Sequence, residues 1–354
     1  MDEEFFDYAI EGTTLRELFE HDSSKRVVVL DRSANYGTTY SSLSALQYSP
    51  YVSDFRVLKD RLKGVKCKIR IESLPFLLGS KDKAVQQFKH TVFGSEIEYV
   101  EINEIYLFSS SFFKIPTSKN DIVALGLSKT DMFYLYKSIK NHDLGILRTR
   151  FSDKSHPIYR ALVELEVFGP QDFRKYCENF GSTLFLYPAY GLSEISESVC
   201  MSNAFKGATY VLNKNLDYTV DNSREYSHRF TCDLGVIHAK EYLKQDLRRK
   251  PYHIRVILTQ KQKFTGNFLG FIERPFDFVV TGNEEIHLSS KYTRIIGINC
   301  LANVCDEGLQ LLYFINEHNN VTNYEVESLS IYEKDILLDI SYKTVYDIEQ
   351  FKVK

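Results

Sequence analysis

The chain has 354 residues, of which 44% are hydrophobic and 26% are charged, so it has enough apolar material for one large domain or two. Its 44 lysines and arginines nearly balance its 47 aspartates and glutamates, and the formal net charge of −3 argues against a nucleic-acid partner. No apolar run approaches the ~20 residues of a membrane-spanning helix. The acidic start Met1–Glu4 lacks the basic and apolar segments of a signal peptide, so we expect a cytoplasmic protein.

The first residues are expected to form a β-α-β unit. The pattern predicts a short strand over Phe5–Ile10, a turn at Gly12 and a short helix over Thr13–His21. Lys25–Asp31 follows as a buried, β-branched strand that ends on an acid. This acid follows Gly12 at about the distance at which a dinucleotide-binding fold contacts a ribose.

The phosphate site of such a fold is not intact. Counting from Gly12, Thr14 and Glu17 replace the second and third glycines of a GxGxxG pattern. Thr14 adds a side chain where the backbone must approach a phosphate, and Glu17 adds negative charge near the helix start. We therefore expect a Rossmann-like scaffold without a cofactor.

The middle of the chain is expected to be mainly helical. A helix is predicted over Ala84–Thr91, a two-faced antiparallel strand or hairpin over Glu96–Phe108, and helical segments over Asp121–His142 and His156–Phe180. Strands are predicted over Gly207–Asn213, Ile254–Thr259, Gly270–Val280, Thr293–Cys300 and Gln310–Asn316. This order predicts an α/β main domain, discontinuous over 1–120 and 181–354, with a small helical domain inserted at 121–180.

No complete catalytic or metal-binding pattern is present. Gly191–Glu194 resembles part of a GxSxG nucleophile elbow, but Ile195 stands where the last glycine is needed. His156 and His238 have no companion residues at catalytic or metal-ligand spacing. The cysteines form no CxxC pair and are expected to be reduced structural thiols: Cys67, Cys177, Cys200, Cys232, Cys300 and Cys305. We expect neither a metal nor an enzyme.

Two tyrosine-bearing loops are more informative. Phe185–Glu194 is expected to be an irregular loop that carries Tyr187 and Tyr190, and Asp31–Gly37 a loop that displays Tyr36. Tyrosine has a rigid apolar body and a polar tip, which suits a protein interface. The alternative is that these tyrosines belong to the core, and the residues alone leave both interpretations open.

The two loops are part of a series of segments that occur in one known family. The series consists of DRSANYG (31–37), KIPTS (114–118), LYPAYGLSE (186–194) and GATYVLNKN (207–215). Together these segments resemble the Rab GDP-dissociation inhibitors, which share a superfamily with the Rab escort proteins and, more distantly, with FAD-dependent oxidases. Further similarities in family order are EGTTLRE (11–17), IESLPFLL (71–78) and ISYKTVYDIE (340–349).

The resemblance implies a fold and a function. The fold would be an FAD-oxidase-like main domain with mixed sheets and no cofactor, together with a small helical domain. The function would be that of an inhibitor that binds GDP-bound, prenylated Rab GTPases, slows GDP release and cycles Rab between membrane and cytosol in vesicle transport. The helical domain would shelter the geranylgeranyl lipid, with only transient peripheral membrane contact. Such a protein is a carrier and regulator, not a catalyst.

The resemblance also implies which residues contact the Rab. Tyr36, Glu194 and Thr209 match the family's binding surface, where they would make aromatic contacts and hydrogen bonds to the switch regions, and Tyr190 lies in the same loop. Two further positions depart from the family, because Met201 replaces an arginine and Val211 a methionine. We include them in the expected site. Met201 cannot form a charge-assisted hydrogen bond, so one polar contact is expected to be missing or replaced.

The helical segment is shorter than in the family, with the shortfall between Thr130 and Phe180. Its apolar side chains could line a prenyl groove: Met132, Phe133, Leu135, Tyr136, Ile139, Tyr159, Leu162, Val163, Leu165 and Phe168. The same residues would suit the core of a reduced helical cap equally well. Both interpretations stay open.

Three alternatives to the inhibitor function follow from the same residues. The first is a Rab escort protein, the accessory component of the Rab geranylgeranyl transferase. The second, an FAD-dependent oxidoreductase, is disfavoured by Thr14 and Glu17. The third is a scaffold that has lost Rab binding, which would bury Tyr36 and Glu194 or place them on different faces.

Overall fold

The computed structural model describes most of the chain. The described residues are 3–12, 24–37, 42–44, 54–57, 69–90, 93–108, 112–168, 170–212, 215–221, 225–243, 249–260, 264, 266–274, 292–302, 304–316 and 320–347. The helix expected at 13–21, with Thr14 and Glu17, lies outside them, as does Cys67. Among the described residues, no helix combines the length and the apolar character needed to cross a bilayer.

The first sheet contains the expected β-α-β strands. Its six strands, in the order β11-β2-β1-β14-β13-β12, are β1 (Glu3–Glu11), β2 (Val27–Asp31), β11 (Thr209–Leu212), β12 (Asp217–Val220), β13 (His228–Cys232) and β14 (Gly235–Leu243). The strands from β11 to β14 in this order are parallel, and β13 and β12 are antiparallel. The strands predicted at 5–10, 25–31 and 207–213 are thus confirmed within one or two residues of their ends.

The second sheet is larger and mostly antiparallel. Its order is β4-β19-β15-β18-β17-β16-β8-β9. The strands are β4 (Asp54–Val57), β8 (Glu104–Phe108), β9 (Phe112–Ile115), β15 (Arg249–Thr259), β16 (Phe268–Glu273), β17 (Tyr292–Asn299), β18 (Gln310–Asn316) and β19 (Ile336–Asp347). Only the β16–β8 pair is parallel. The predictions at 254–259, 293–300 and 310–316 are confirmed, whereas 275–280 lies outside the described residues.

Two small sheets lie between these large ones. One pairs β3 (Ser42–Ser44) with β5 (Arg70–Glu72), and the other has the order β6-β10-β7, formed by β6 (Leu78–Gly79), β7 (Tyr99–Ile102) and β10 (Phe185–Pro188). The single strand or hairpin expected at 96–108 is therefore wrong. The chain leaves the small sheet after Ile102 and enters the large one at Glu104, and Asn103 between them accepts a hydrogen bond from the Leu184 amide.

The helices are short, and side chains cap the N-termini of α4, α5 and α10. They are α3 (Lys83–Lys89), α4 (Lys119–Ala124), α5 (Lys129–Lys140), α6 (Gly145–Arg150), α7 (Pro157–Phe168), α8 (Pro170–Asn179), α9 (Ser193–Phe205) and α10 (Asn323–Ser328), with single 3₁₀ turns at Gly94–Glu96, Cys300–Ala302 and Glu333–Asp335. The segment predicted as helical over 121–142 is divided at Gly126, which adopts a positive φ of 69°. Ser128 then caps α5 by accepting a hydrogen bond from the Asp131 amide.

Helix α9 was not predicted from the sequence. Phe185–Glu194, expected to be an irregular loop, contains the whole of β10, a tight turn and the start of α9. The helix was missed because three of its first six residues are serines, which are poor helix formers. Burial of Ile195, Val199 and Cys200 on one face provides the tertiary packing that stabilises it.

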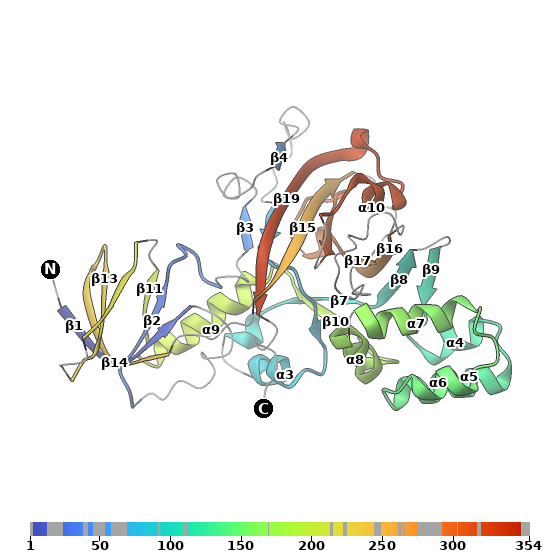
Figure 1. Cartoon of the computed structure of the whole chain (residues 1–354), viewed down its shortest axis with the longest axis horizontal. Coiled ribbons are helices and arrows are strands. Elements are labelled where there is room, and N and C mark those ends of the chain that lie inside the picture. The colour runs from blue at the N-terminus through green and yellow to red at the C-terminus, as the bar shows by residue number, and fades with distance from the viewer. Residues whose placement is uncertain are drawn as a thin grey trace, which may run out of the picture.

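The largest hydrophobic core joins the helices to the sheets. Leu135 and Ile139 of α5 and Leu162 of α7 belong to the same buried cluster as Ile71 of β5 and Phe185 of β10. Figure 1 shows the six-stranded sheet at one end, helices α4–α8 at the other, and α9 leading from that sheet toward the centre. Because α4–α8 share this core with the sheets, an independent helical domain at 121–180 stays a prediction.

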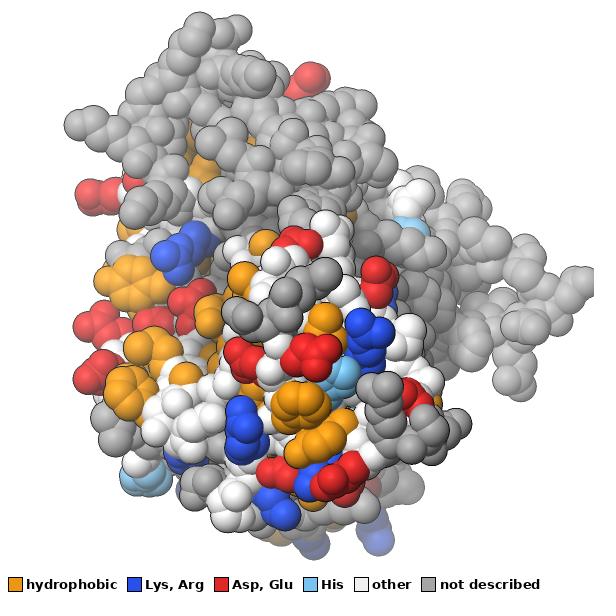
Figure 2. All heavy atoms as spheres, turned by 90° about the vertical axis from the view of Figure 1, so that its left-hand side faces the viewer, with side chains coloured by type: hydrophobic (Ala, Val, Ile, Leu, Met, Phe, Trp, Pro, Cys, Tyr) orange, Lys and Arg blue, Asp and Glu red, His pale blue; other side chains and the backbone are white. Residues whose placement is uncertain are grey.

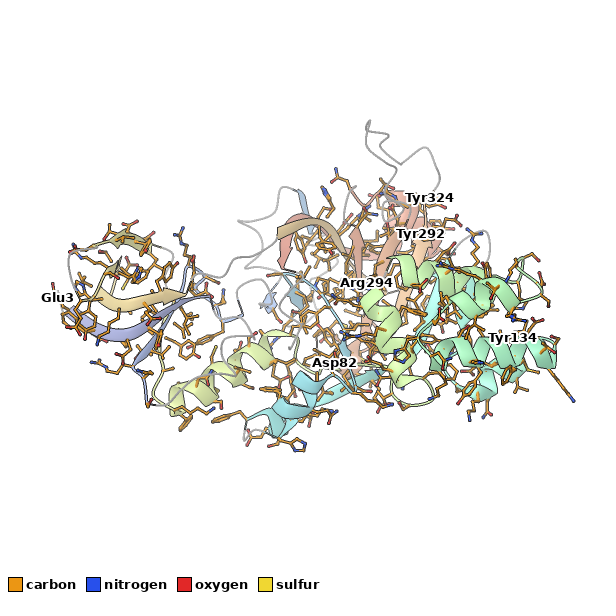
Figure 3. All side chains as sticks on the ribbon, turned by 60° about the horizontal axis from the view of Figure 1, so that its bottom comes forward. Glu3, Asp82, Tyr134, Tyr292, Arg294 and Tyr324 are labelled. Carbon is orange, nitrogen blue, oxygen red and sulfur yellow. The ribbon has the colours of Figure 1, made fainter. Side chains whose placement is uncertain are left out.

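Charged side chains also join α8 to its neighbours. Arg294 Nε of β17 lies 2.9 Å from Asp172 Oδ2 of α8, and Lys175 Nζ of α8 lies 3.5 Å from Asp82 Oδ2. Figure 3 labels Arg294 and Asp82 close to this helix. These pairs place fixed charges around the helical end of the molecule.

Candidate partner-binding surface

The turn between β10 and α9 presents two of the residues expected to contact a partner. The Tyr190 side chain is 43% exposed, and Glu194 lies half-buried in the first turn of α9. Arg70 Nη1 holds the turn by donating a hydrogen bond of 2.8 Å to the Tyr190 carbonyl oxygen. Tyr187, one residue before Pro188, is fully buried instead. The two tyrosines of this segment thus divide between surface and core.

Glu194 itself has an unusual environment for a surface carboxylate. Its Oε2 atom is buried and has no hydrogen-bond partner among the described residues. Burial raises the pKa of Glu194, and the nearby Arg70 opposes this shift. A half-buried carboxylate with free acceptor capacity is suited to accept a hydrogen bond from a partner.

The exposed face of α9 changes character along its length. Glu194 and Glu197 lie near its start, whereas Met201 is 50% exposed and Phe205 is 80% exposed at its end. The Phe205 ring lies 5.3 Å from that of Phe93, centroid to centroid. We call Tyr190, Glu194, Met201 and Phe205 the α9 surface. An exposed methionine and phenylalanine beside acidic residues form the kind of mixed patch found in protein interfaces.

Tyr36 and Thr209 lie close to this helix. The centroid of the Tyr36 ring is 5.9 Å from that of the Tyr210 ring of β11. Burial is the main cause that raises the pKa of Tyr36, and the neighbouring Cys200 of α9 adds to it. Thr209 begins β11 and is exposed. Tyr36 and Glu194 are both partly exposed, so they are not buried as the scaffold alternative expects in one of its two forms.

Val211 does not belong to this surface. Its side chain is buried at 6% exposure in the core of the six-stranded sheet, where it pairs with Leu30 and shares a hydrophobic cluster with Val28 and Phe230. Including it among the Rab-contacting residues was therefore wrong. Thr209, two residues earlier on β11, is exposed, and nothing in the sequence indicated that the sheet buries Val211.

A residue that the sequence analysis did not single out lies directly below the surface. The Glu72 carboxylate, fully buried in β5, accepts hydrogen bonds from Tyr187 Oη at 2.6 Å, from the Leu192 amide at 3.0 Å and from Ser42 Oγ at 2.8 Å. Burial raises its pKa to about 7 against the opposing effect of these hydrogen bonds. The acidic residue within IESLPFLL was its one sequence signal.

The residues expected to line a prenyl groove divide into two groups. Leu135, Ile139, Leu162 and Leu165 are fully buried, as the helical-cap interpretation requires. Met132, Tyr136, Tyr159 and Val163 are partly buried and pack against the same core, and Phe133 is 58% exposed. Nothing is described of the Phe168 side chain. Only the second group is placed where a lipid could reach it.

The candidate catalytic residues have structural roles. Ser193 is buried, and its amide donates to Ser42 Oγ at 3.0 Å. His156 Nδ1 accepts the Ile158 amide at the start of α7, and the buried His238 ring stacks on Phe5. Among the described residues, no group of three or more histidine, cysteine or acidic side chains is arranged for a metal, and the described cysteines are free thiols.

Asp31, the acid at the end of β2, is not presented to a ribose. It is buried, and its Oδ1 atom accepts the Ser33 amide at 2.8 Å, while Ser33 Oγ accepts the Asn35 amide at 3.1 Å. These bonds shape the loop that carries Tyr36. The Asp31 carboxylate thus supports a loop of its own chain.

Comparisons with known proteins identify the fold. No protein-family model and no curated protein matches the chain. Among solved structures, a Rab GDI from Plasmodium falciparum is similar with a TM-score of 0.66 and 17% identity, covering 97% of this chain and 89% of that one.

Two oxidoreductases are also similar. One from Methanosarcina mazei gives a TM-score of 0.57 at 12% identity, covering 97% of this chain and 88% of that one. A putative protoporphyrinogen oxidase from Exiguobacterium sp. gives 0.50 at 11%, covering 97% and 86%. The expected α/β, FAD-oxidase-like fold with mixed sheets is confirmed. At these identities the likeness concerns the fold alone.

Proposed function

We propose that the chain is a Rab GDP-dissociation inhibitor of reduced length, a carrier and regulator rather than an enzyme. It binds prenylated Rab GTPases in the GDP state, slows GDP release and moves Rab between membrane and cytosol. The observation that carries the proposal is the structural likeness to a Rab GDI over 97% of this chain, at a TM-score above those of the two oxidoreductases. Of the segments that resemble this family, LYPAYGLSE (186–194) leads into α9 and GATYVLNKN (207–215) follows it.

The α9 surface supports the partner-binding part of this function. Tyrosine, phenylalanine and methionine are over-represented at interfaces, and here they surround a half-buried carboxylate on one helix and its preceding turn. Figure 2 views the neighbouring end of the molecule and shows hydrophobic side chains gathered between acidic and basic ones. A mixed surface of this kind can give specificity through its charges and affinity through its apolar contacts.

Preference for the GDP state requires differential contacts. The protein stabilises the GDP-bound conformation only by as much as it binds that conformation more tightly than the GTP-bound one. A 100-fold preference corresponds to about 2.8 kcal/mol, which one or two well-placed side chains can supply. We expect Tyr190 and Glu194 to make the contacts that distinguish the switch regions of GDP-bound Rab from those of GTP-bound Rab.

Lipid sheltering is assigned to the exposed side of α5 and α7. Each buried CH₂ of a prenyl chain contributes about 0.8 kcal/mol, so even partial cover of a geranylgeranyl group competes with a bilayer. Met132, Tyr136, Tyr159 and Val163 are partly buried apolar side chains of these two helices, and Phe133 lies exposed beside them.

A membrane-extraction assay tests the proposal. Prenylated Rab loaded with GDP or GTP is placed on liposomes, the purified chain is added, and soluble Rab is measured. We expect extraction of GDP-loaded Rab only, reduced in Phe205→Ala and unchanged in Leu301→Ala, a comparably exposed side chain after β17. Without extraction, stimulated prenylation of Rab by its transferase would instead assign the escort function.

The oxidoreductase neighbours support a second candidate, an FAD-dependent oxidoreductase. It requires a bound flavin, and the engaged carboxylate of Asp31 argues against one. The absorbance spectrum of the purified protein decides between the two, because a flavoprotein is yellow.

A further inference from the structure

The start of α9 lacks the cap that a helix normally has. Its N-cap residue, Leu192, makes no side-chain capping hydrogen bond. The first amide groups of a helix have no partner within the helix and must find one elsewhere. At this helix the amides of Glu194 and Ile195 donate to the Gly191 and Leu192 carbonyl oxygens. The amides of Leu192 and Ser193 donate to side chains from two other strands.

The partners of these amides are Glu72 and Ser42. The Leu192 amide donates to Glu72 Oε1 at 3.0 Å, and the Ser193 amide donates to Ser42 Oγ at 3.0 Å. Ser42 Oγ in turn donates to Glu72 Oε2 at 2.8 Å. The two strands that carry them, β3 and β5, are paired at these very residues. A negative charge at this place also complements the positive end of the helix dipole.

The turn lies directly against the carboxylate. Gly191 has a φ of +97°, which favours glycine, and a Cβ atom at this position would lie 2.7 Å from both Glu72 Oε1 and Ser42 Oγ. The turn therefore packs directly against Glu72 and Ser42, with no space for a side chain at position 191. This packing sets the position of Tyr190, which precedes Gly191, and that of Glu194, which follows it in the first turn of α9.

Glu72 is itself held firmly. Its backbone amide donates to Tyr313 Oη at 3.1 Å, and its carbonyl oxygen accepts the Tyr342 hydroxyl. Its carboxylate also accepts the buried Tyr187 hydroxyl. Tyrosines from β10, β18 and β19 thus hold Glu72 in place, and Glu72 holds the turn before α9. Glu72, Tyr187 and Tyr313 are fully buried, and Tyr342 is partly buried.

We infer that Glu72 is a positioning residue for partner recognition: through the Leu192 and Ser193 amides it sets the place of Tyr190 and Glu194 on the α9 surface. The inference rests on the proposed function, since it states how the recognition surface is held. It adds a residue that touches no partner, and it assigns Ser42 as the second cap of α9.

Substitutions with a local readout test this. Glu72→Leu removes both acceptor oxygens, whereas Glu72→Gln keeps one oxygen for the Leu192 amide. We expect hydrogen-exchange protection of the Leu192 and Ser193 amides to fall at least ~10-fold in Glu72→Leu and to be largely retained in Glu72→Gln. Affinity for GDP-loaded Rab should follow the same order. Glu325→Leu is the matched control, because Glu325 is an equally buried carboxylate in α10.

A milder variant covers the case in which Glu72→Leu does not fold. Ser42→Ala removes the acceptor of the Ser193 amide and leaves the Leu192 bond to Glu72 in place. We expect a loss of protection at Ser193 that exceeds the loss at Leu192. Equal protection of both amides in Ser42→Ala and wild type would overturn the inference.

The outcomes separate this inference from the proposed function. If Glu72→Leu loses protection at the turn but binds Rab as tightly as wild type, while Tyr190→Ala binds weakly, Glu72 does not position the surface and the proposed function stands. If wild type binds no Rab, the proposed function fails, and the amide exchange alone decides whether Glu72 holds the turn.

Discussion

The α9 surface and the pair of helices α5 and α7 carry similar side chains in opposite settings. Both contain aromatic residues, methionine and branched aliphatics at helical spacing, and the resemblance to the inhibitor family marks both as binding regions. On α9, Met201 and Phe205 stand exposed, whereas Leu135, Ile139 and Leu162 of the other pair are fully buried. Helical spacing of apolar residues therefore indicates a core at least as often as a binding site, and exposure decides between them.

The two regions also differ in how they are held. The buried carboxylate of Glu72 holds the turn before α9 through hydrogen bonds, in addition to the apolar packing of one face of the helix. The buried side chains Leu135, Ile139 and Leu162 of α5 and α7 pack in the main core. A surface held by directional bonds keeps a defined shape when a few apolar contacts are lost. A packed helix pair loses stability directly with each deleted methyl group.

The largest effect is expected from a core substitution in the helix pair. Leu162→Ala should lower the free energy of unfolding by about 2–5 kcal/mol, because it leaves a cavity in a fully packed site. Urea denaturation measures this, with Phe133→Ala as the exposed control in the same region. A Leu162→Ala chain of normal stability that has lost lipid binding would instead make this residue part of a groove.

Truncations on the α9 surface should weaken Rab binding and leave the free energy of unfolding nearly unchanged. Phe205→Ala and Glu194→Ala are each expected to weaken Rab binding by about 1–3 kcal/mol, since the first removes apolar contact area and the second a charge-assisted hydrogen bond. Tyr36→Ala should act in the same direction. Thermal denaturation should show little change for Phe205→Ala. Unchanged affinity in all three variants would remove the site assignment.

The pH dependence of folding should carry the signature of Glu72. Its pKa is raised from 4.5 to about 7 in the folded chain, so between these values the folded state binds more protons than the unfolded state. This group therefore lowers the free energy of unfolding as the pH rises from about 4.5 to about 7. Chemical denaturation over this range should show that the free energy of unfolding of wild type falls as the pH rises, and that it falls less in Glu72→Gln.

The smallest effect concerns the residue that departs from the family. Met201→Arg restores a charged donor on an exposed position of α9, and a gain in Rab affinity of up to about 1 kcal/mol is expected. Comparison of the association rates at low and high salt would show whether the new charge acts through steering. A loss of affinity would mean that Met201 itself makes the apolar contact.

The sequence predicted the parts of the fold that have strong local signals. The β-branched run ending at Asp31 and the paired apolar patterns after residue 254 correspond to observed strands. Helix α9 was not predicted, because its serine-rich start has weak propensity and depends on Glu72, a residue of another strand. Long-range capping of this kind leaves no local pattern to read.

The candidate site was predictable in part for a related reason. Tyr36, Tyr190, Glu194 and Thr209 come from segments that resemble a known family, and the structure places them around one helix. Val211 was misassigned because strand alternation does not show which part of a strand the sheet covers. Phe205 was overlooked because nothing in the sequence distinguishes an exposed phenylalanine from a buried one.

The proposed function is tested most directly by the affinity of the chain for one Rab in its two nucleotide states, measured with wild type, Phe205→Ala and Leu301→Ala. We predict that GDP-loaded Rab binds at least ~10-fold more tightly than GTP-loaded Rab, that Phe205→Ala weakens this binding, and that Leu301→Ala does not. Equal affinity for both states, or equal weakening by the two substitutions, would contradict the proposed function.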